Sequence, residues 1–117
     1  MHRMTRLGLA AGALAALALP FAVIASAQEA EPAPALTAEQ VTKGRQLFTD
    51  NGCNACHTLA DADAAGSVGP SFDGNANLDK GHVISVVSNG QGAMPSFSWL
   101  GEEDIDLIAA YIVQAKK

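Results

Sequence analysis

Five consecutive residues, Cys53-Asn54-Ala55-Cys56-His57, decide how the rest of the chain is interpreted. Two thiols at this spacing, followed at once by a histidine, are typical of covalent haem attachment. The thiols add to the two vinyl groups of one haem, and the imidazole reaches its iron. We therefore expect one haem c, with its iron, attached through Cys53 and Cys56 and ligated on one face by His57.

Two other uses of paired cysteines fit this motif less well. A thioredoxin-like redox dithiol would follow a strand and would not need the adjacent histidine, whereas this motif follows a helical pattern. A structural zinc site needs four ligands, and after residue 27 the only further Cys or His is His82. Adjacent Cys56 and His57 would also serve a tetrahedron poorly.

Met94 is the candidate for the second axial ligand of the iron. It is the only methionine after residue 27, and it lies in a loop of glycines followed by Pro95. The glycines let the chain approach a ring closely, and the proline fixes the backbone. A thioether ligand raises the reduction potential relative to a second histidine. The alternative is an ordinary core methionine.

With both axial positions filled, a substrate, oxygen or peroxide would find no open coordination site on the iron. We therefore expect no catalytic residues and an electron-transfer protein rather than an enzyme.

Residues 1–27 are expected to form an export signal peptide. Two arginines precede an apolar stretch over residues 7–25, and Ala25-Ser26-Ala27 supplies the small residues that signal peptidase reads. Cleavage after Ala27 would release the protein into a bacterial periplasm. The alternative is an uncleaved membrane anchor facing the periplasm, because the apolar stretch approaches the ~20 residues that span a bilayer.

The segment after the expected cleavage site divides into a flexible leader, residues 28–36, and one domain, residues 37–117. Removing residues 1–27 takes away two of the seven basic residues and none of the twelve acidic ones. The net charge therefore changes from −5 to −7. An acidic surface disfavours nucleic acid and favours partner proteins that present a basic patch.

The first helix of the domain is predicted from a capping box. The Thr37 hydroxyl is placed to accept from the Gln40 amide, and the Gln40 side chain reaches back. The helix should stop at Asn51-Gly52, and Gly44 on its apolar face allows another helix to approach closely. Residues 53–79 have no sustained periodicity and are predicted to be loop-like.

Two more helices are predicted in the second half of the domain. One begins at Asp79 or Lys80 and ends near Asn89-Gly90. The last begins after Gly101, where three acidic residues favour the amino-terminal end of a helix. Its apolar stripe consists of Ile105, Ile108, Ala109 and Ile112, flanked by Leu107 and Tyr111.

The domain has few large apolar side chains for its size. Its aromatic residues are Phe48, Phe72, Phe97, Trp99 and Tyr111. Domains this small often need an additional stabilising group. We therefore expect an all-α domain of three to four helices around one covalently bound haem, which folds poorly when the haem is absent.

The motifs together resemble the class I, small monohaem cytochromes c. The resemblance rests on C-N-A-C-H at 53–57, V-G-P-S-F at 68–72, A-M-P-S-F at 93–97 and a terminal helix, and it covers roughly residues 36–114. It implies the cytochrome c fold.

The resemblance also implies two contacts. The carbonyl of Pro70 would accept a hydrogen bond from the second ring nitrogen of His57 and so fix the orientation of the ring. The first and last helices would cross near Gly44, Phe48 and Tyr111.

Two residues outside these motifs carry separate expectations. His82 is expected to be solvated at the start of a short helix rather than bound to iron. For Trp99 the sequence leaves two roles open: packing against the haem or the last helix, or exposure on a docking surface.

The function predicted from the residues and the resemblance is that of a periplasmic monohaem c-type cytochrome in a respiratory chain. It would carry electrons between redox partners such as a dehydrogenase, a quinol-oxidising complex or a terminal oxidase. One alternative is a dedicated electron-transfer subunit of a periplasmic dehydrogenase complex. Another is a haem enzyme or gas sensor in which Met94 is displaced.

Overall fold

The computed structural model describes residues 33–117, and the expected export signal lies outside the described residues, as does most of the expected leader. The helices are α1 (Ala38–Asp50), α2 (Cys53–Cys56), α3 (Lys80–Asn89) and α4 (Glu102–Ala115). Two 3-10 turns, η1 (Ala60–Ala62) and η2 (Ser98–Leu100), and two short strands, β1 (Thr58–Leu59) and β2 (Ala64–Ala65), connect them. The all-α prediction is confirmed.

The ends of α1 are those that the sequence predicts. The Thr37 hydroxyl accepts from the Gln40 N–H at 3.2 Å, and the Gln40 side chain accepts from the Thr37 N–H at 2.9 Å. At the other end, Asn51 caps the helix through its backbone N–H and its side-chain amide. These bonds satisfy backbone groups that have no partner inside the helix.

The ends of α3 and α4 also agree with the sequence. Asp79 accepts from the His82 N–H at 2.9 Å and so caps the start of α3. Gly90 follows α3 with φ of +73°, and Gly101 precedes α4 with φ of +84°. L-residues with side chains adopt such angles at a cost, which is why glycine occupies both positions.

The prediction of a loop over residues 53–79 was wrong in part. This stretch contains the single turn α2 and an antiparallel hairpin in which Leu59 pairs with Ala64. Helical turns and strands this short give no periodic pattern from which to predict them.

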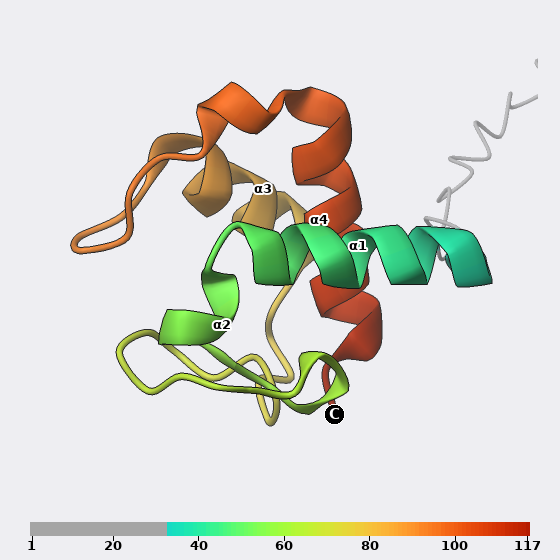
Figure 1. The fold of residues 1–117 in the computed structure, drawn as a ribbon, viewed down its shortest axis with the longest axis horizontal. Coiled ribbons are helices and arrows are strands. Elements are labelled where there is room, and N and C mark those ends of the chain that lie inside the picture. The colour runs from blue at the N-terminus through green and yellow to red at the C-terminus, as the bar shows by residue number, and fades with distance from the viewer. Residues whose placement is uncertain (1–32) are drawn as a thin grey trace, which may run out of the picture. The chain divides into compact units, whose positions relative to one another are not determined.

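The helix α1 crosses α4, and the two helices pack against each other (Figure 1). A Cβ atom built on Gly44 would lie only 2.6 Å from Cβ of Tyr111. Phe48 packs edge-on against Tyr111 with ring centroids 6.3 Å apart. The crossing implied by the family resemblance is therefore present, and glycine is what permits it.

The core lies where α1, α3 and α4 pack together. Its buried apolar side chains are Phe48, Leu59, Ala64, Val83, Val87, Ile105, Ile108, Ala109, Tyr111 and Ile112. The predicted stripe on the last helix is thus the face that α4 turns inward. Among residues 33–117, no helix has both the length and the apolar character needed to cross a membrane.

A polar cluster joins α1, η1 and α4 at the edge of this core. Arg45 donates to Oδ2 of Asp61 at 2.8 Å, and the Tyr111 hydroxyl donates to the same oxygen at 2.6 Å. The hydroxyl of Tyr111, together with Arg45, lowers the pKa of the Asp61 carboxyl. Because Asp61 lies between the cysteine motif and Pro70, the cluster fixes that connection to both helices.

We expect Gly44→Ala to destabilise the haem-loaded protein by about 1–3 kcal/mol, because the added methyl group overpacks the helix crossing. This loss outweighs the gain of up to ~1 kcal/mol that alanine brings inside a helix. Gly81→Ala is the matched control, since its methyl group would meet only a carboxylate oxygen of Asp79 at 3.3 Å. Denaturant unfolding of both variants measures the difference, and equal stabilities would contradict the close packing.

Asp61→Asn is expected to lower the free energy of unfolding near neutral pH by about 1–2 kcal/mol, since it removes a charged acceptor. A carboxyl group whose pKa is lower in the folded than in the unfolded protein stabilises the fold at pH values above the unfolded-state pKa. This stabilisation is lost as the pH falls through the folded-state pKa. The gap between wild type and variant should therefore close on acidification below about pH 4. Asp63→Asn, the same change on an exposed neighbour, should show no such pH-dependent gap.

Candidate functional site

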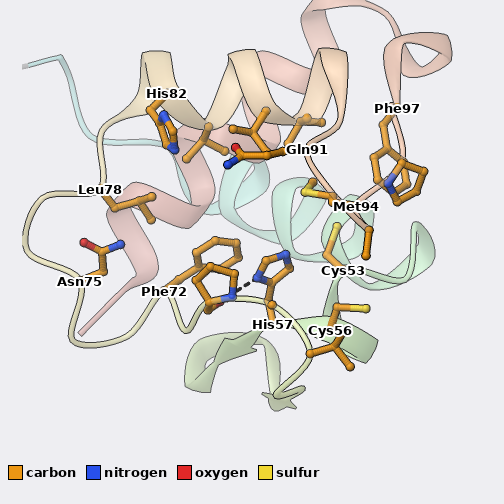
Figure 2. A pocket seen from close by; sticks show the side chains of 18 of the residues that line it. Cys53, Cys56, His57, Phe72, Asn75, Leu78, His82, Gln91, Met94 and Phe97 are labelled. Carbon is orange, nitrogen blue, oxygen red and sulfur yellow. Dashed lines mark hydrogen bonds between the residues drawn. The ribbon is translucent and has the colours of Figure 1, made fainter.

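A cavity of about 620 Å³ opens beside α2 and α3 (Figure 2). Its volume is within the range of about 300–1,000 Å³ that is usual for bound cofactors and ligands. The walls come from residues within four segments, 52–57, 68–72, 75–87 and 91–97. Every site residue predicted from the sequence lines it: Cys53, Cys56, His57, Pro70 and Met94.

His57 is buried, with 8% of its surface exposed, and its ring is held by three contacts. Nδ1 lies 2.7 Å from the carbonyl oxygen of Pro70. A carbonyl only accepts, so Nδ1 carries the proton and Nε2 keeps a free lone pair. Phe72 stacks on the ring at 4.5 Å, and a Cβ atom on Gly69 would lie 2.5 Å from Cε1. This arrangement leaves Nε2 available as a metal ligand.

The two cysteines occupy the first and last positions of the single turn α2. Both thiols are free, and both line the cavity. Burial raises the pKa of the Cys53 thiol to about 11. A redox dithiol or a zinc thiolate needs the opposite shift, toward the thiolate. The buried Cys53 thiol is therefore poorly suited to either of those alternatives.

Met94 is positioned by a tight backbone turn. The Gln91 N–H donates to the Met94 carbonyl oxygen at 3.0 Å, and the Met94 N–H donates to the Gln91 carbonyl oxygen at 3.0 Å. The Phe97 N–H donates to Val87 at 2.8 Å, which attaches the loop to α3. Gly90 has no room for a side chain, since a Cβ atom there would lie 2.7 Å from the Met94 carbonyl oxygen. The thioether takes part in none of these bonds and lines the cavity across from His57 (Figure 2).

The residues around the cavity fit a covalently held haem. The two thiols lie toward one end, the imidazole and the thioether lie on opposite sides, and apolar side chains form much of the remaining wall (Figure 2). These apolar residues are Val68, Phe72, Leu78, Val83, Val86, Val87 and Phe97. Apolar walls and a soft thioether suit an iron porphyrin, whose large faces are themselves apolar.

Some residues of the site were not identified from the sequence. Asn75, Asn77 and Gln91 also line the cavity, although nothing in their local sequence distinguishes them from solvated loop residues. His82 is exposed, as predicted, yet it too borders the cavity. Trp99 is 71% exposed, which favours the surface role over packing against the last helix.

The family comparison agrees with this arrangement. Residues 39–112 match the family model described as "Cytochrome C oxidase, cbb3-type, subunit III". Among solved structures, the c-type cytochrome SorU from Sinorhizobium meliloti is 36% identical in sequence. The match has a TM-score of 0.61 and covers 68% of this chain and 93% of SorU.

Three proteins named cytochrome c6 are also similar. The protein of Bryopsis maxima is 37% identical over 81 residues, which is 59% of this chain and 84% of the relative. That of Diacronema lutheri is 31% identical over 78 residues, covering 62% and 93% of the two chains. That of Cyanidioschyzon merolae is 34% identical over 88 residues, covering 68% and 80%. With its motif, fold and cavity, the chain belongs to the class I, small monohaem cytochromes c, which carry covalently bound haem c.

Proposed function

We propose that this c-type cytochrome is an exported electron carrier that takes single electrons from one redox partner in the periplasm and passes them to another. The observation that carries the proposal is the pair of side chains, His57 and Met94, on opposite sides of one cavity. With a ligand on each side, electrons can pass through the iron while substrates find no coordination site.

Each residue of the site has a distinct task in the proposal. Bound haem c supplies an iron that changes oxidation state by one electron. Cys53 and Cys56 would attach the haem covalently as thioethers, and Nε2 of His57 would ligate the iron. Pro70 fixes the ring, since the hydrogen bond to Nδ1 selects the tautomer and makes Nε2 a stronger donor.

Met94 completes the proposed coordination and sets the direction in which the potential is shifted. A thioether stabilises ferrous iron relative to ferric iron, so it raises the potential. The apolar wall acts in the same direction, because a surrounding of low polarity disfavours the more highly charged ferric state. We therefore expect a carrier of high reduction potential.

The location and the partners are proposed from the sequence and the charge. A basic amino-terminal region, an apolar stretch and Ala25-Ser26-Ala27 support export and cleavage. The expected net charge of −7 without residues 1–27 favours partners with a basic docking patch. A dehydrogenase or a quinol-oxidising complex would be the electron donor, and a terminal oxidase of a respiratory chain would be the acceptor.

A second candidate is a dedicated electron-transfer subunit that stays bound to one complex. The description of the matching family names a subunit of an oxidase, which favours this candidate, whereas the sequence alone predicts a subunit of a dehydrogenase complex. Size-exclusion chromatography of native extract, monitored by haem absorption, separates the two candidates. A free small species supports the shuttle, and haem that elutes only in a large complex supports the subunit.

Replacing Met94 by alanine should open one axial position of the iron. We expect the reduced variant to bind carbon monoxide at neutral pH, which the wild type should not do. The reduction potential should fall by on the order of 0.1 V, a modest part of the ~0.8 V range that axial ligands set. Absorption spectra and a redox titration measure both effects.

Gln91→Ala is the control for that experiment, since Gln91 lines the same cavity and should leave carbon monoxide excluded. If the wild type already binds carbon monoxide and Met94→Ala changes nothing, Met94 is not the ligand. The haem enzyme or gas sensor would then be the better explanation.

Protein made without haem attachment, through Cys53→Ser with Cys56→Ser, should lose most of its helix and its cooperative thermal unfolding. A small domain is stable by only about 5–15 kcal/mol, and a bound haem would add a large apolar body to its core. Far-ultraviolet circular dichroism measures the loss. Native-like helix content and a sharp transition in the haem-free protein would contradict the expectation that haem completes the core.

A further inference from the structure

The two ends of the cavity differ in their side chains. The thiols of Cys53 and Cys56 lie toward one end, and Asn75, Leu78 and His82 lie toward the other (Figure 2). The segment from residue 75 to residue 82 contributes most of the polar lining. Its polar members are Asn75, Asn77, Asp79 and His82.

This distribution bears on how a haem would lie in the cavity. In a haem, the two vinyl groups and the two propionate groups occupy opposite edges of the porphyrin. Thioether bonds to Cys53 and Cys56 fix the vinyl edge toward α2. The propionate carboxylates are then directed to the opposite end, where residues 75–82 supply the polar groups.

Two carboxylates at that end need hydrogen-bond donors and compensating positive charge. Among residues 33–117, no lysine or arginine lines the cavity. The imidazole of His57 is directed to Pro70 and, in the proposed function, to the iron. His82 is therefore the remaining lining residue of the described chain that can become a cation, and Asn75 and Asn77 can add neutral donors.

The charged groups around this end are already engaged elsewhere. Asp79 accepts from the His82 backbone N–H at 2.9 Å. On the side toward α4, Lys80 pairs with Asp106 at 2.8 Å. At the end of α4, Lys116 donates to the carbonyl oxygen of Asn75 at 2.6 Å, on the loop rather than in the cavity.

We propose that His82 binds a haem propionate and that its protonation is coupled to the oxidation state of the iron, so that electron transfer is linked to proton uptake. The proposal rests on the proposed function, because it requires covalent haem in this cavity. It differs from the expectation that His82 is merely solvated.

The coupling follows from charge balance. Reduction adds one electron, supplied by a redox partner protein, and removes one positive charge from the site. His82 becomes more basic and takes one proton from a hydronium ion of the solvent, so that one N–H bond forms and one O–H bond breaks. Oxidation returns the electron to a partner and the proton to water. Histidine is the side chain whose charge ordinarily changes between about pH 5 and 8, so the linkage would act near neutrality.

The expected consequence is a reduction potential that falls as the pH rises. If the reduced protein binds the proton tenfold more tightly than the oxidised protein, the acid and alkaline plateaus differ by about 59 mV for this one-electron couple. Spectroelectrochemical titration of the haem-loaded protein between about pH 5 and 8 measures this change.

Two substitutions distinguish the effect of a titrating charge at position 82 from the effect of a hydrogen-bond donor there. His82→Gln keeps a hydrogen-bond donor without a titrating charge, so its potential should be independent of pH and close to the alkaline plateau. His82→Lys supplies a fixed positive charge, so its potential should also be flat, but close to the acid plateau. Glu39→Gln changes the net charge by one unit on exposed α1, outside the cavity lining, and should keep the wild-type slope.

A flat wild-type profile would overturn the proposal, as would a slope that survives in His82→Gln, which would assign the titration to the propionates or another group. The absorption spectrum recorded in the same titration distinguishes failure of the His82 proposal from failure of the proposed function. Bound haem with a reversible couple but no dependence on His82 defeats this inference alone. Absence of haem from the wild type defeats the proposed function itself.

Discussion

The hydrogen bond between Nδ1 of His57 and the carbonyl oxygen of Pro70 is the interaction on which the site depends. It determines which ring nitrogen is protonated, and so which nitrogen has a lone pair free to bind iron. An imidazole that could rotate or change tautomer would present a ligand only part of the time. The short contact from Gly69 and the stacked ring of Phe72 prevent that rotation.

The rest of the fold holds this hydrogen bond in place. The Gly69 N–H donates to the Cys56 carbonyl at 2.7 Å, so the loop that carries Pro70 is attached to the cysteine motif. The same connection is fixed to α1 and α4 through Asp61. Those two helices can approach each other because Gly44 has no side chain. One close crossing thus supports a loop whose backbone oxygen orients a histidine.

On the other side of the cavity from His57, Met94 is positioned by a separate set of backbone hydrogen bonds. The turn at residues 91–94 and the attachment to α3 do not involve the thioether. The two proposed ligands therefore come from parts of the chain that are independently positioned, and the cavity lies between them. A haem bound there would connect both parts and enlarge a core that has few large side chains of its own.

Much of this arrangement could be predicted from the sequence, because its signals are local. The capping box at Thr37, the acidic first turn after Gly101 and the cysteine motif each occupy only a few adjacent residues. The Asp61 cluster could not be predicted, since its partners lie 16 and 50 residues away and only the tertiary fold brings them together. The position of His82 was missed for the same reason, because its local sequence indicates only an exposed helix start.

The most direct test of the central claim is the intact mass of the exported protein, measured after denaturation and treatment with a thiol-alkylating reagent. We expect one haem retained covalently on a chain that begins at Gln28, with Cys53 and Cys56 both protected from alkylation. Alkylation of both cysteines together with loss of the haem, or a disulfide between the cysteines, would contradict it.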